Sequence, residues 1–199
     1  MKYLIVDTSH KYLNIGLVEE ERIVENYQVE SHKSQSEKIV PTIMELFKKH
    51  SWSVDDLNGM VITKGPGSYT GVRIAMTVAK VLCTLKPISL YTVSTLQAYG
   101  GVLERVCVLI DARSNRAFCG VYDQGKAIIE DCVLPLEDIK RLVDENSYHC
   151  VGDTMLLGHK EVDMDIIGNI MALKDEWTLV DNVHTLTPTY LKEQEAYGK

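Results

Sequence analysis

Two short stretches carry the residues best suited to chemistry. Residues 65–71, Gly-Pro-Gly-Ser-Tyr-Thr-Gly, lie between a short apolar run at 60–63 and a nearly all-apolar helix over 72–85. A strand, a glycine turn and a helix start commonly aim backbone N–H groups at an anion. The second stretch, Asp7-Thr8-Ser9, follows an apolar strand and offers a carboxylate and two hydroxyls. The glycine turn is therefore either a phosphate cradle or a brace for a helix that meets a partner.

The phosphate interpretation has two weaknesses. The glycine loop contains no Walker lysine, and its Pro66 has no backbone N–H to offer a phosphate. We favour the structural interpretation, in which the glycines allow a tight turn and Asp7 caps a backbone group or forms a salt bridge, for example to Arg73. The candidate nucleotide-binding residues are Asp7, Thr8, Ser9, Gly65, Gly67 and Ser68.

Metal and nucleophile chemistry find little support. None of the histidines forms an H-x-x-x-H or H-E-x-x-H pair, so we predict no metal ligand; they are His10, His32, His50, His149, His159 and His184. Ser68, Ser9 or Cys83 would need an adjacent base to act as a nucleophile, and nothing brings a histidine near Ser68. A peptidase is therefore disfavoured, and we predict no catalytic residue.

Composition indicates an ordinary globular protein of the cytosol. The chain has 199 residues, 45% of them hydrophobic and 25% charged, and a net charge of −7 that argues against a broad nucleic-acid footprint. Its five cysteines show no metal-knuckle or C-x-x-C spacing, and we expect reduced, mostly buried thiols. The N-terminus reaches Asp7 too soon for a signal peptide, and no apolar stretch is long enough to span a bilayer.

The periodicity of apolar residues predicts an α/β fold whose element order occurs twice. Strands are expected at 3–6, 14–18, 23–29, 60–63 and 88–93, with helices at 34–50, 72–85 and 94–104. Ser34 and Glu37 form a capping-box pattern at the start of the first helix. The second half repeats three strands (106–110, 117–122, 126–133), a helix (136–146) and a strand (148–151). Asp7 and Asp111 hold matching places, each ending the first strand of its half.

This repetition predicts two lobes of mixed sheet flanked by helices. The first lobe spans 1–104, and a shorter second lobe spans 105–199. The pattern over 152–181 is weak and indicates only short helices and loops. The tail at 186–199 is expected to dock back, because Tyr190 and Leu191 follow the rigid Pro188.

Two helices offer more apolar surface than one sheet face needs. In the helix over 72–85, small residues at Gly71, Ala75 and Ala79 line one face, and this helix is either a central core helix or a subunit interface. An Ala75→Arg or Ala79→Arg change is expected to break a dimer while leaving the monomer folded. The predicted interface residues are Ile39, Ile43, Leu46, Phe47, Gly71, Val72, Ala75, Met76, Ala79 and Leu82.

Segments along the whole chain resemble the TsaB (YeaZ) family. Residues 65–74, GPGSYTGVRI, are similar to its GPGSFTGLRIG signature. Further similar segments are LIVDTS at 4–9, SEKIVP at 36–41, VSTLQ at 93–97, DAR at 111–113 and PTYLK at 188–192.

The resemblance implies an ASKHA fold, the actin/hexokinase/Hsp70-like and ribonuclease H-like frame with two lobes. It implies a non-catalytic paralogue of the metal-dependent subunit TsaD. With TsaD and the ATPase TsaE, the family places threonylcarbamoyl on the adenosine beside the anticodon of tRNAs reading ANN codons. The helices of its first lobe pair with TsaD, or with a second copy when TsaD is absent. In related ATPases, the place of Asp7-Thr8-Ser9 holds Mg²⁺ and phosphate.

The chain departs from that family at two points. Many members carry His where this chain has Gln35, and the second lobe is short after Gly152. We expect a partner subunit with no cofactor of its own, for which ATP/ADP–Mg would bind only at an interface of the complex, and with tRNA engaged indirectly. The alternative is a stand-alone ASKHA-type ATPase or phosphotransferase.

Overall fold

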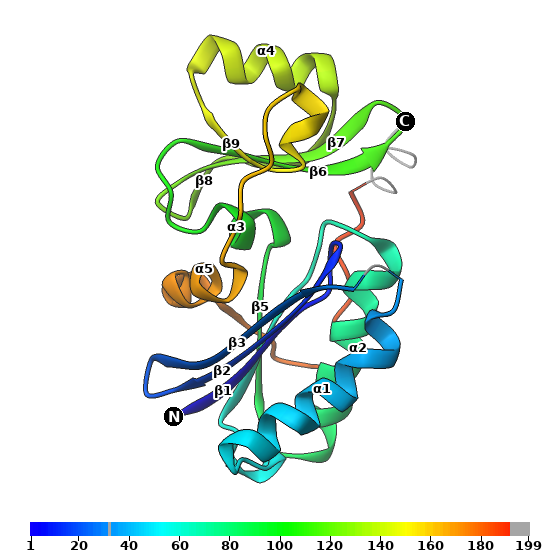
Figure 1. Cartoon of the computed structure of the whole chain (residues 1–199), viewed down its shortest axis with the longest axis vertical. Helices are drawn as coiled ribbons and strands as arrows, with labels where there is room; N and C mark the ends of the chain where they lie inside the picture. The colour runs from blue at the N-terminus through cyan, green and yellow to red at the C-terminus, as the bar shows by residue number, and fades with distance from the viewer. Residues whose placement is uncertain (32, 192–199) are drawn as a thin grey trace.

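Two β-sheets, with helices between and outside them, form the protein in a computed structural model that describes residues 1–31 and 33–191. The first sheet has the strand order β10-β5-β4-β1-β2-β3, and the second has the order β8-β7-β6-β9 (Figure 1). The strands are β1 (Lys2–Asp7), β2 (Tyr12–Glu19), β3 (Arg22–Glu30), β4 (Gly59–Thr63), β5 (Ser89–Val93), β6 (Val106–Arg113), β7 (Arg116–Asp123), β8 (Lys126–Pro135), β9 (His149–Gly152) and β10 (Thr178–Leu179). The helices are α1 (Gln35–His50), α2 (Tyr69–Leu85), α3 (Thr95–Gly100), α4 (Leu136–Asn146) and α5 (Ile166–Ala172), with 3₁₀ turns η1 (Val54–Asp56), η2 (Thr154–Leu157) and η3 (Lys174–Glu176).

The repeated element order predicted from the sequence is confirmed. In each half, three antiparallel strands are followed by a helix and by a strand that pairs in parallel with the first strand. The first half is β1-β2-β3-α1-β4, and the second is β6-β7-β8-α4-β9. The parallel pairing needs a crossover connection, which α1 and α4 provide.

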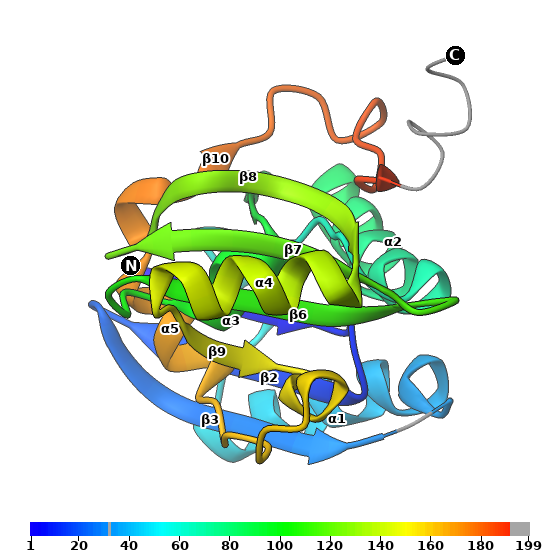
Figure 2. The ribbon, with the colours of Figure 1, turned by 90° about the horizontal axis from the view of Figure 1, so that it is seen from above.

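The alternation of side chains along β1 shows how the layers are built. Leu4 and Val6 pack with α1 and α2 on one face of the first sheet, whereas Tyr3 and Ile5 pack on the opposite face. On that opposite face, α3 and α5 lie between the two sheets, and α4 covers the outer face of the second sheet (Figures 1 and 2). The molecule is therefore layered as helices, sheet, helices, sheet, helix.

Helix α1 covers the first sheet as its apolar stripe predicts. Ile39, Ile43 and Phe47 are buried against the sheet, and Pro41 lies on the exposed side of the helix. The predicted capping box is wrong, because the Ser34 side chain makes no capping hydrogen bond and its Oγ instead donates to Ser31 O at 3.3 Å.

Helix α2 presents its small-residue face to the sheet. Ala75 and Ala79 are fully buried, and a Cβ on Gly71 would lie 2.1 Å from Thr8 O. This close approach decides between the two roles left open by the sequence, because the stripe of small residues faces the chain's own core. The remaining apolar side of α2 is exposed, with Val81 at 51% and Leu85 at 73%.

Two boundaries differ from those predicted. Helix α3 ends at Gly100 and not near residue 104, because Gly101 adopts φ 55°, which is not a helical conformation and which glycine accepts most readily. Strand β10 was not predicted; its two residues pair antiparallel with Tyr91 and Thr92 and add an edge to the first sheet.

A partly buried carboxyl links α3 to the second sheet. Asp131 on β8 accepts a hydrogen bond from Ser94 Oγ (2.5 Å), the N-cap of α3, and another from the Tyr122 hydroxyl. Burial raises the pKa of Asp131 above its ordinary value of 3.8, although both hydrogen bonds oppose that shift. The ionised carboxylate therefore costs stability at neutral pH.

We predict that Ala75→Arg destabilises the monomer by about 3 kcal/mol or more, because it places a bulky charge against a packed sheet. Urea unfolding followed by circular dichroism measures the loss. The control is Thr77→Arg, which introduces the same residue at an exposed position of α2 and is expected to leave the midpoint nearly unchanged. An unchanged midpoint for Ala75→Arg would show that α2 packs differently.

We predict that Asp131→Asn is more favourable to stability at pH 7 than at pH 4. A carboxyl with a raised folded pKa binds more protons folded than unfolded, so the free energy of unfolding falls as pH rises from 3.8 through the folded pKa. The amide cannot ionise, so the free energy of unfolding of the variant does not fall in this way as the pH rises. Urea titrations of both proteins at the two pH values give the difference, and an equal effect at both pH values would contradict the raised pKa.

Candidate functional site

Asp7, the last residue of β1, is the fully buried centre of the first candidate cluster. Its Oδ1 accepts hydrogen bonds from Ser9 N (3.0 Å), Ser9 Oγ (2.5 Å) and Thr63 Oγ1 (2.6 Å). Its Oδ2 accepts one from Asn14 Nδ2 at 2.8 Å. The carboxylate thereby joins β1 to its neighbours β2 and β4. The suggested salt bridge to Arg73 is wrong, because the Arg73 side chain is exposed and donates to Tyr69 Oη at 3.2 Å.

The glycine loop packs against the turn that follows β1. Ser68 N donates to Ser9 O at 2.7 Å, and a Cβ on Gly67 would lie 2.5 Å from the same oxygen. Thr8 Oγ1 donates to Gly71 O at 2.6 Å and accepts from Ala75 N at 3.1 Å. The two glycines are therefore needed so that two backbone segments can touch.

These contacts test whether the predicted residues fit a magnesium-bound nucleotide. Four protein donors already occupy the Asp7 carboxylate, and Ser9 O takes the N–H of Ser68 that a phosphate would need. Gly65, the remaining glycine of the set, faces the C-terminal tail, since a Cβ there would lie 3.0 Å from Thr189 O. The six predicted residues do not fit a phosphate or Mg²⁺ in this arrangement.

The candidate nucleophiles also have structural partners. Ser68 Oγ caps α2 by accepting from Gly71 N at 3.2 Å, and Ser9 Oγ donates to Asp7. Burial raises the pKa of the Cys83 thiol to about 11, which disfavours its thiolate. Among the described contacts, none joins Ser68 or Cys83 to a histidine, so the geometry offers no activated nucleophile there.

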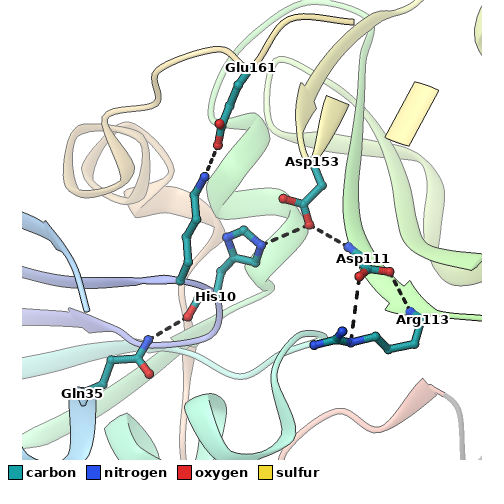
Figure 3. Close-up of polar contacts among 7 residues, drawn as sticks. His10, Gln35, Asp111, Arg113, Asp153 and Glu161 are labelled. Carbon is teal, nitrogen blue, oxygen red and sulfur yellow. Dashed lines mark hydrogen bonds and ion pairs between the residues drawn. The ribbon is translucent and has the colours of Figure 1, made fainter. Parts of the chain in front are cut away.

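A polar contact between the two sheets was not predicted. His10 Nε2 lies 3.1 Å from Asp153 Oδ2, which also accepts from Asp111 N at 2.8 Å, and Gln35 Nε2 donates to His10 O at 2.7 Å (Figure 3). Lys11 pairs with Glu161 beside this contact. Gln35 therefore anchors the start of α1 to the β1–β2 turn.

The surroundings of Asp153 favour the ionised form of its carboxyl group. Burial opposes its ionisation, but the hydrogen bond and charge of His10 and the N–H of Asp111 outweigh burial and lower the pKa of this carboxyl. Strand register would have predicted the contact with Asp111. Leu109 pairs with Gly152, so Asp153, which follows β9, lies beside the last part of β6. Asp111 matches Asp7 in topology only, since its side chain is exposed and β6 continues to Arg113.

Two concave surfaces flank these contacts. A cleft of about 1170 Å³ lies between the two halves, and a groove of about 330 Å³ lies between α1 and α2. Residues lining the cleft include His10, Lys11, Lys33, Gly67, Ser68, Asp111, Arg113, Asp153, Glu161 and Tyr190. The groove is lined by Ser36, Ile39, Val40, Tyr69, Thr70, Arg73, Ile74, Thr77 and Val78.

Most residues predicted for a partner interface lie in the core and not on these surfaces. Leu82 alone of the ten is half-buried, and the nine buried ones are Ile39, Ile43, Leu46, Phe47, Gly71, Val72, Ala75, Met76 and Ala79. A side chain buried against its own sheet cannot also pack against a second protein. The apolar side chains left on the same two helices include Val40 at 48% exposure and Met44 at 66%.

The described part of the C-terminal tail contacts the glycine loop. Thr189 N donates to Lys64 O at 2.8 Å, and the Tyr190 ring stacks on Tyr69 with centroids 5.1 Å apart. Leu191 packs against the core between the sheets. Residues 192–199 of the predicted docking tail lie outside the described residues.

Metal-binding clusters and membrane-spanning helices are both absent from residues 1–31 and 33–191. No group of three or more His, Cys, Asp or Glu side chains in these ranges has an arrangement that could hold a metal ion. None of the helices in the same ranges has both the length and the apolar character needed to cross a membrane.

A family model matches this chain, as do relatives of known name. The family model described as TsaD, tRNA N6-adenosine threonylcarbamoyltransferase, matches residues 24–147. The tRNA threonylcarbamoyladenosine biosynthesis protein TsaB of Bacillus subtilis is 28% identical over 100% of this chain and 97% of its own length. The protein of the same name from Escherichia coli is 26% identical over 63% of this chain and 57% of its own length.

Solved structures identify the fold. YeaZ from Pseudomonas aeruginosa superposes with a TM-score of 0.77 at 20% identity, covering 96% of this chain and 100% of that one. A second P. aeruginosa structure, described as an uncharacterized protein with similarity to peptidase YEAZ, gives 0.76 at 22% identity over 96% of this chain and 99% of that one. The expected ASKHA, ribonuclease H-like fold with mixed sheets flanked by helices is confirmed. With a match over more than half of its length, this chain belongs to the TsaD family of tRNA N6-adenosine threonylcarbamoyltransferases, and within it resembles the TsaB (YeaZ) proteins throughout.

Proposed function

We propose that this protein is a non-catalytic partner subunit in the formation of N6-threonylcarbamoyladenosine beside the anticodon of tRNAs reading ANN codons. It acts with a TsaD-like catalytic subunit and a TsaE-like ATPase, and it engages tRNA through that complex. Family membership and the names of the relatives support the pathway. The five thiols suit the reducing cytosol as the compartment.

The way in which the glycine loop is used supports the non-catalytic role. In this chain the loop packs on the β1–β2 turn through the hydrogen bond from Ser68 N to Ser9 O. The Asp7 carboxylate accepts hydrogen bonds from the two neighbouring strands. The Asp7 carboxylate and Ser68 N are thus already engaged within the chain, which supports a subunit that assists another protein.

The observation that carries the proposal is the groove between α1 and α2. Its walls include the apolar Val40, Ile74 and Val78, and both of its helices are fixed to the first sheet by their other faces. Exposed Met44 and Val81 extend the apolar surface along the two helices. A partner that contributes two helices would complete a four-helix contact there.

We further propose a two-lobe assignment, with lobe one at 1–104 and lobe two at 105–199. The partner contact belongs to lobe one, because both helices of the groove come from it. A second copy of this chain occupies the same groove when the catalytic subunit is absent.

We predict that Thr77→Arg abolishes co-purification with a TsaD-type catalytic subunit. Thr77 is exposed in the groove, so an arginine there projects bulk and charge at the partner without disturbing the core. The matched control is Thr178→Arg, the same change at an exposed position on the sheet-edge strand β10. A tagged pull-down of both variants gives the readout, with threonylcarbamoyladenosine formation by the reconstituted proteins as a second. Wild-type recovery with Thr77→Arg would rule out this groove as the contact.

One observation favours the alternative, a stand-alone ATPase or phosphotransferase. The cleft between the halves is large and is lined by the cations Lys11, Lys33 and Arg113. We expect the partner role to hold, so calorimetry with Mg-ATP on the isolated protein should detect no binding tighter than the high micromolar range. A low-micromolar dissociation constant together with ATP turnover would establish the alternative.

A further inference from the structure

Four of the five cysteines form a row across the second sheet. Each strand contributes one: Cys132 from β8, Cys119 from β7, Cys107 from β6 and Cys150 from β9. The order of the strands in the sheet is also the order of the row. All four side chains lie on the face that α4 covers, in the same apolar cluster.

Backbone register brings neighbouring thiols together. Cys119 pairs with Cys132 in the antiparallel ladder, and Cys107 pairs with Cys150 in the parallel ladder. The Sγ atoms of Cys107 and Cys119 are 3.6 Å apart. Paired strands lie about 4.8 Å apart, which is within the Cα separations of about 4.4–6.8 Å that a disulfide accepts.

The thiols perturb one another's pKa along the row. Cys107 and Cys119 share a hydrogen bond in which either sulfur can be the donor. A hydrogen bond with Cys107 lowers the pKa of Cys150 despite partial burial. For Cys107 the opposite holds: the contact with Cys119 lowers its pKa, but the contact with Cys150 and burial together outweigh that effect and raise the pKa to about 12. Negative charge is therefore best accommodated at the end of the row.

Solvent access leaves two candidates in the row. Cys107 and Cys119 are fully buried, whereas Cys132 and Cys150 are half-buried on the two edge strands. The Cys132 thiol donates to Cys119 O at 3.4 Å, whereas the thiolate of Cys150 is favoured by its neighbour Cys107. A thiolate is the reactive form of cysteine, and partial exposure lets a small oxidant reach it. Cys83, on α2, is also half-buried, but burial raises its pKa to about 11 and no other cysteine is described beside it.

We propose that this row is a reversible oxidation site for hydrogen peroxide, in which Cys150 reacts first and Cys107 closes a disulfide with it. The Cys150 thiolate attacks one peroxide oxygen, the O–O bond breaks, and hydroxide leaves, giving a sulfenic acid. The sulfur of Cys107 then attacks the Cys150 sulfur; an S–S bond forms, the S–O bond breaks, and the departing hydroxide takes the Cys107 proton as water. Two thiols are oxidised and one peroxide is reduced to two waters.

A second disulfide pairing can form in the row by thiol–disulfide exchange. Cys119 lies in contact with Cys107, so its sulfur can attack the Cys107 sulfur; an S–S bond forms, the bond to Cys150 breaks, and Cys150 leaves as a thiolate that takes up the Cys119 proton. This exchange moves the crosslink from β6–β9 to β6–β7 and restores the reactive residue at the edge.

The test is peroxide treatment of the reduced full chain, followed by alkylation, intact mass and peptide mapping. Each cysteine falls in its own tryptic peptide, which makes the mapping direct; the peptides are 81–105, 106–113, 117–126, 127–140 and 142–160. We expect the monomer to lose two thiols and 2 Da, with peptide 106–113 joined to 142–160 or, after exchange, to 117–126. Dithiothreitol should reverse the change.

Variants separate the roles of the two residues. Cys150→Ser should slow the loss of thiols at least about tenfold, whereas the matched control Cys83→Ser should react as the wild type does. Cys107→Ala, checked for folding by circular dichroism, should leave Cys150 oxidised without an internal crosslink. Cys150→Ser tests the proposal even if Cys107→Ala does not fold. Equal reactivity of Cys83, crosslinks only between molecules, or oxidation of methionine before any thiol would overturn the proposal.

Discussion

The contact of two backbone segments, the turn after β1 and the glycine loop before α2, constrains the rest of the structure. A Cβ on Gly71 would lie 2.1 Å from Thr8 O, a distance that no side chain tolerates. Ser68 N and Thr8 Oγ1 add hydrogen bonds across the same contact. Once this junction forms, α2 can only run along the sheet with its small residues inward, and the carboxylate of Asp7 is sealed beneath it.

That junction divides α2 into two faces with different roles. The buried face, with Ala75 and Ala79, fixes the helix to the sheet. The opposite face, with α1, forms a groove that residues 1–31 and 33–191 leave unfilled. The glycine turn that could have been a phosphate cradle by its sequence packs here against the turn after β1. The polar link through His10 and Asp153 joins the two halves beside the apolar core that lies between the sheets.

Local signals in the sequence were enough for most elements. The three-strand meander and α4 have period-2 and amphipathic patterns that depend on neighbouring residues only, and α4 begins and ends where predicted, at Leu136 and Asn146. The repeated topology followed from the order of these elements. The capping box at Ser34 failed because its hydroxyl has a nearer acceptor in Ser31 O, which sequence spacing cannot show.

The site was harder to predict because it depends on contacts between distant segments. The spacing of Gly71, Ala75 and Ala79 showed a close helix contact but not with which surface, and the answer lay in Thr8, more than sixty residues earlier. Asp153 and the cysteine row depend on strand register in the second sheet, which no local pattern specifies. Composition could indicate reduced thiols, but it could not show that four of them lie side by side across the second sheet.

The central claim is that the outer faces of α1 and α2 hold the catalytic partner while the junction behind them stays closed. Hydrogen–deuterium exchange of this protein, alone and mixed with a TsaD-type catalytic subunit, tests it most directly. The account predicts new protection in the segments around residues 36–44 and 69–81, and no partner-induced protection in the second sheet at 106–152. Protection confined to the second sheet, with both groove helices exchanging as in the isolated protein, would contradict it.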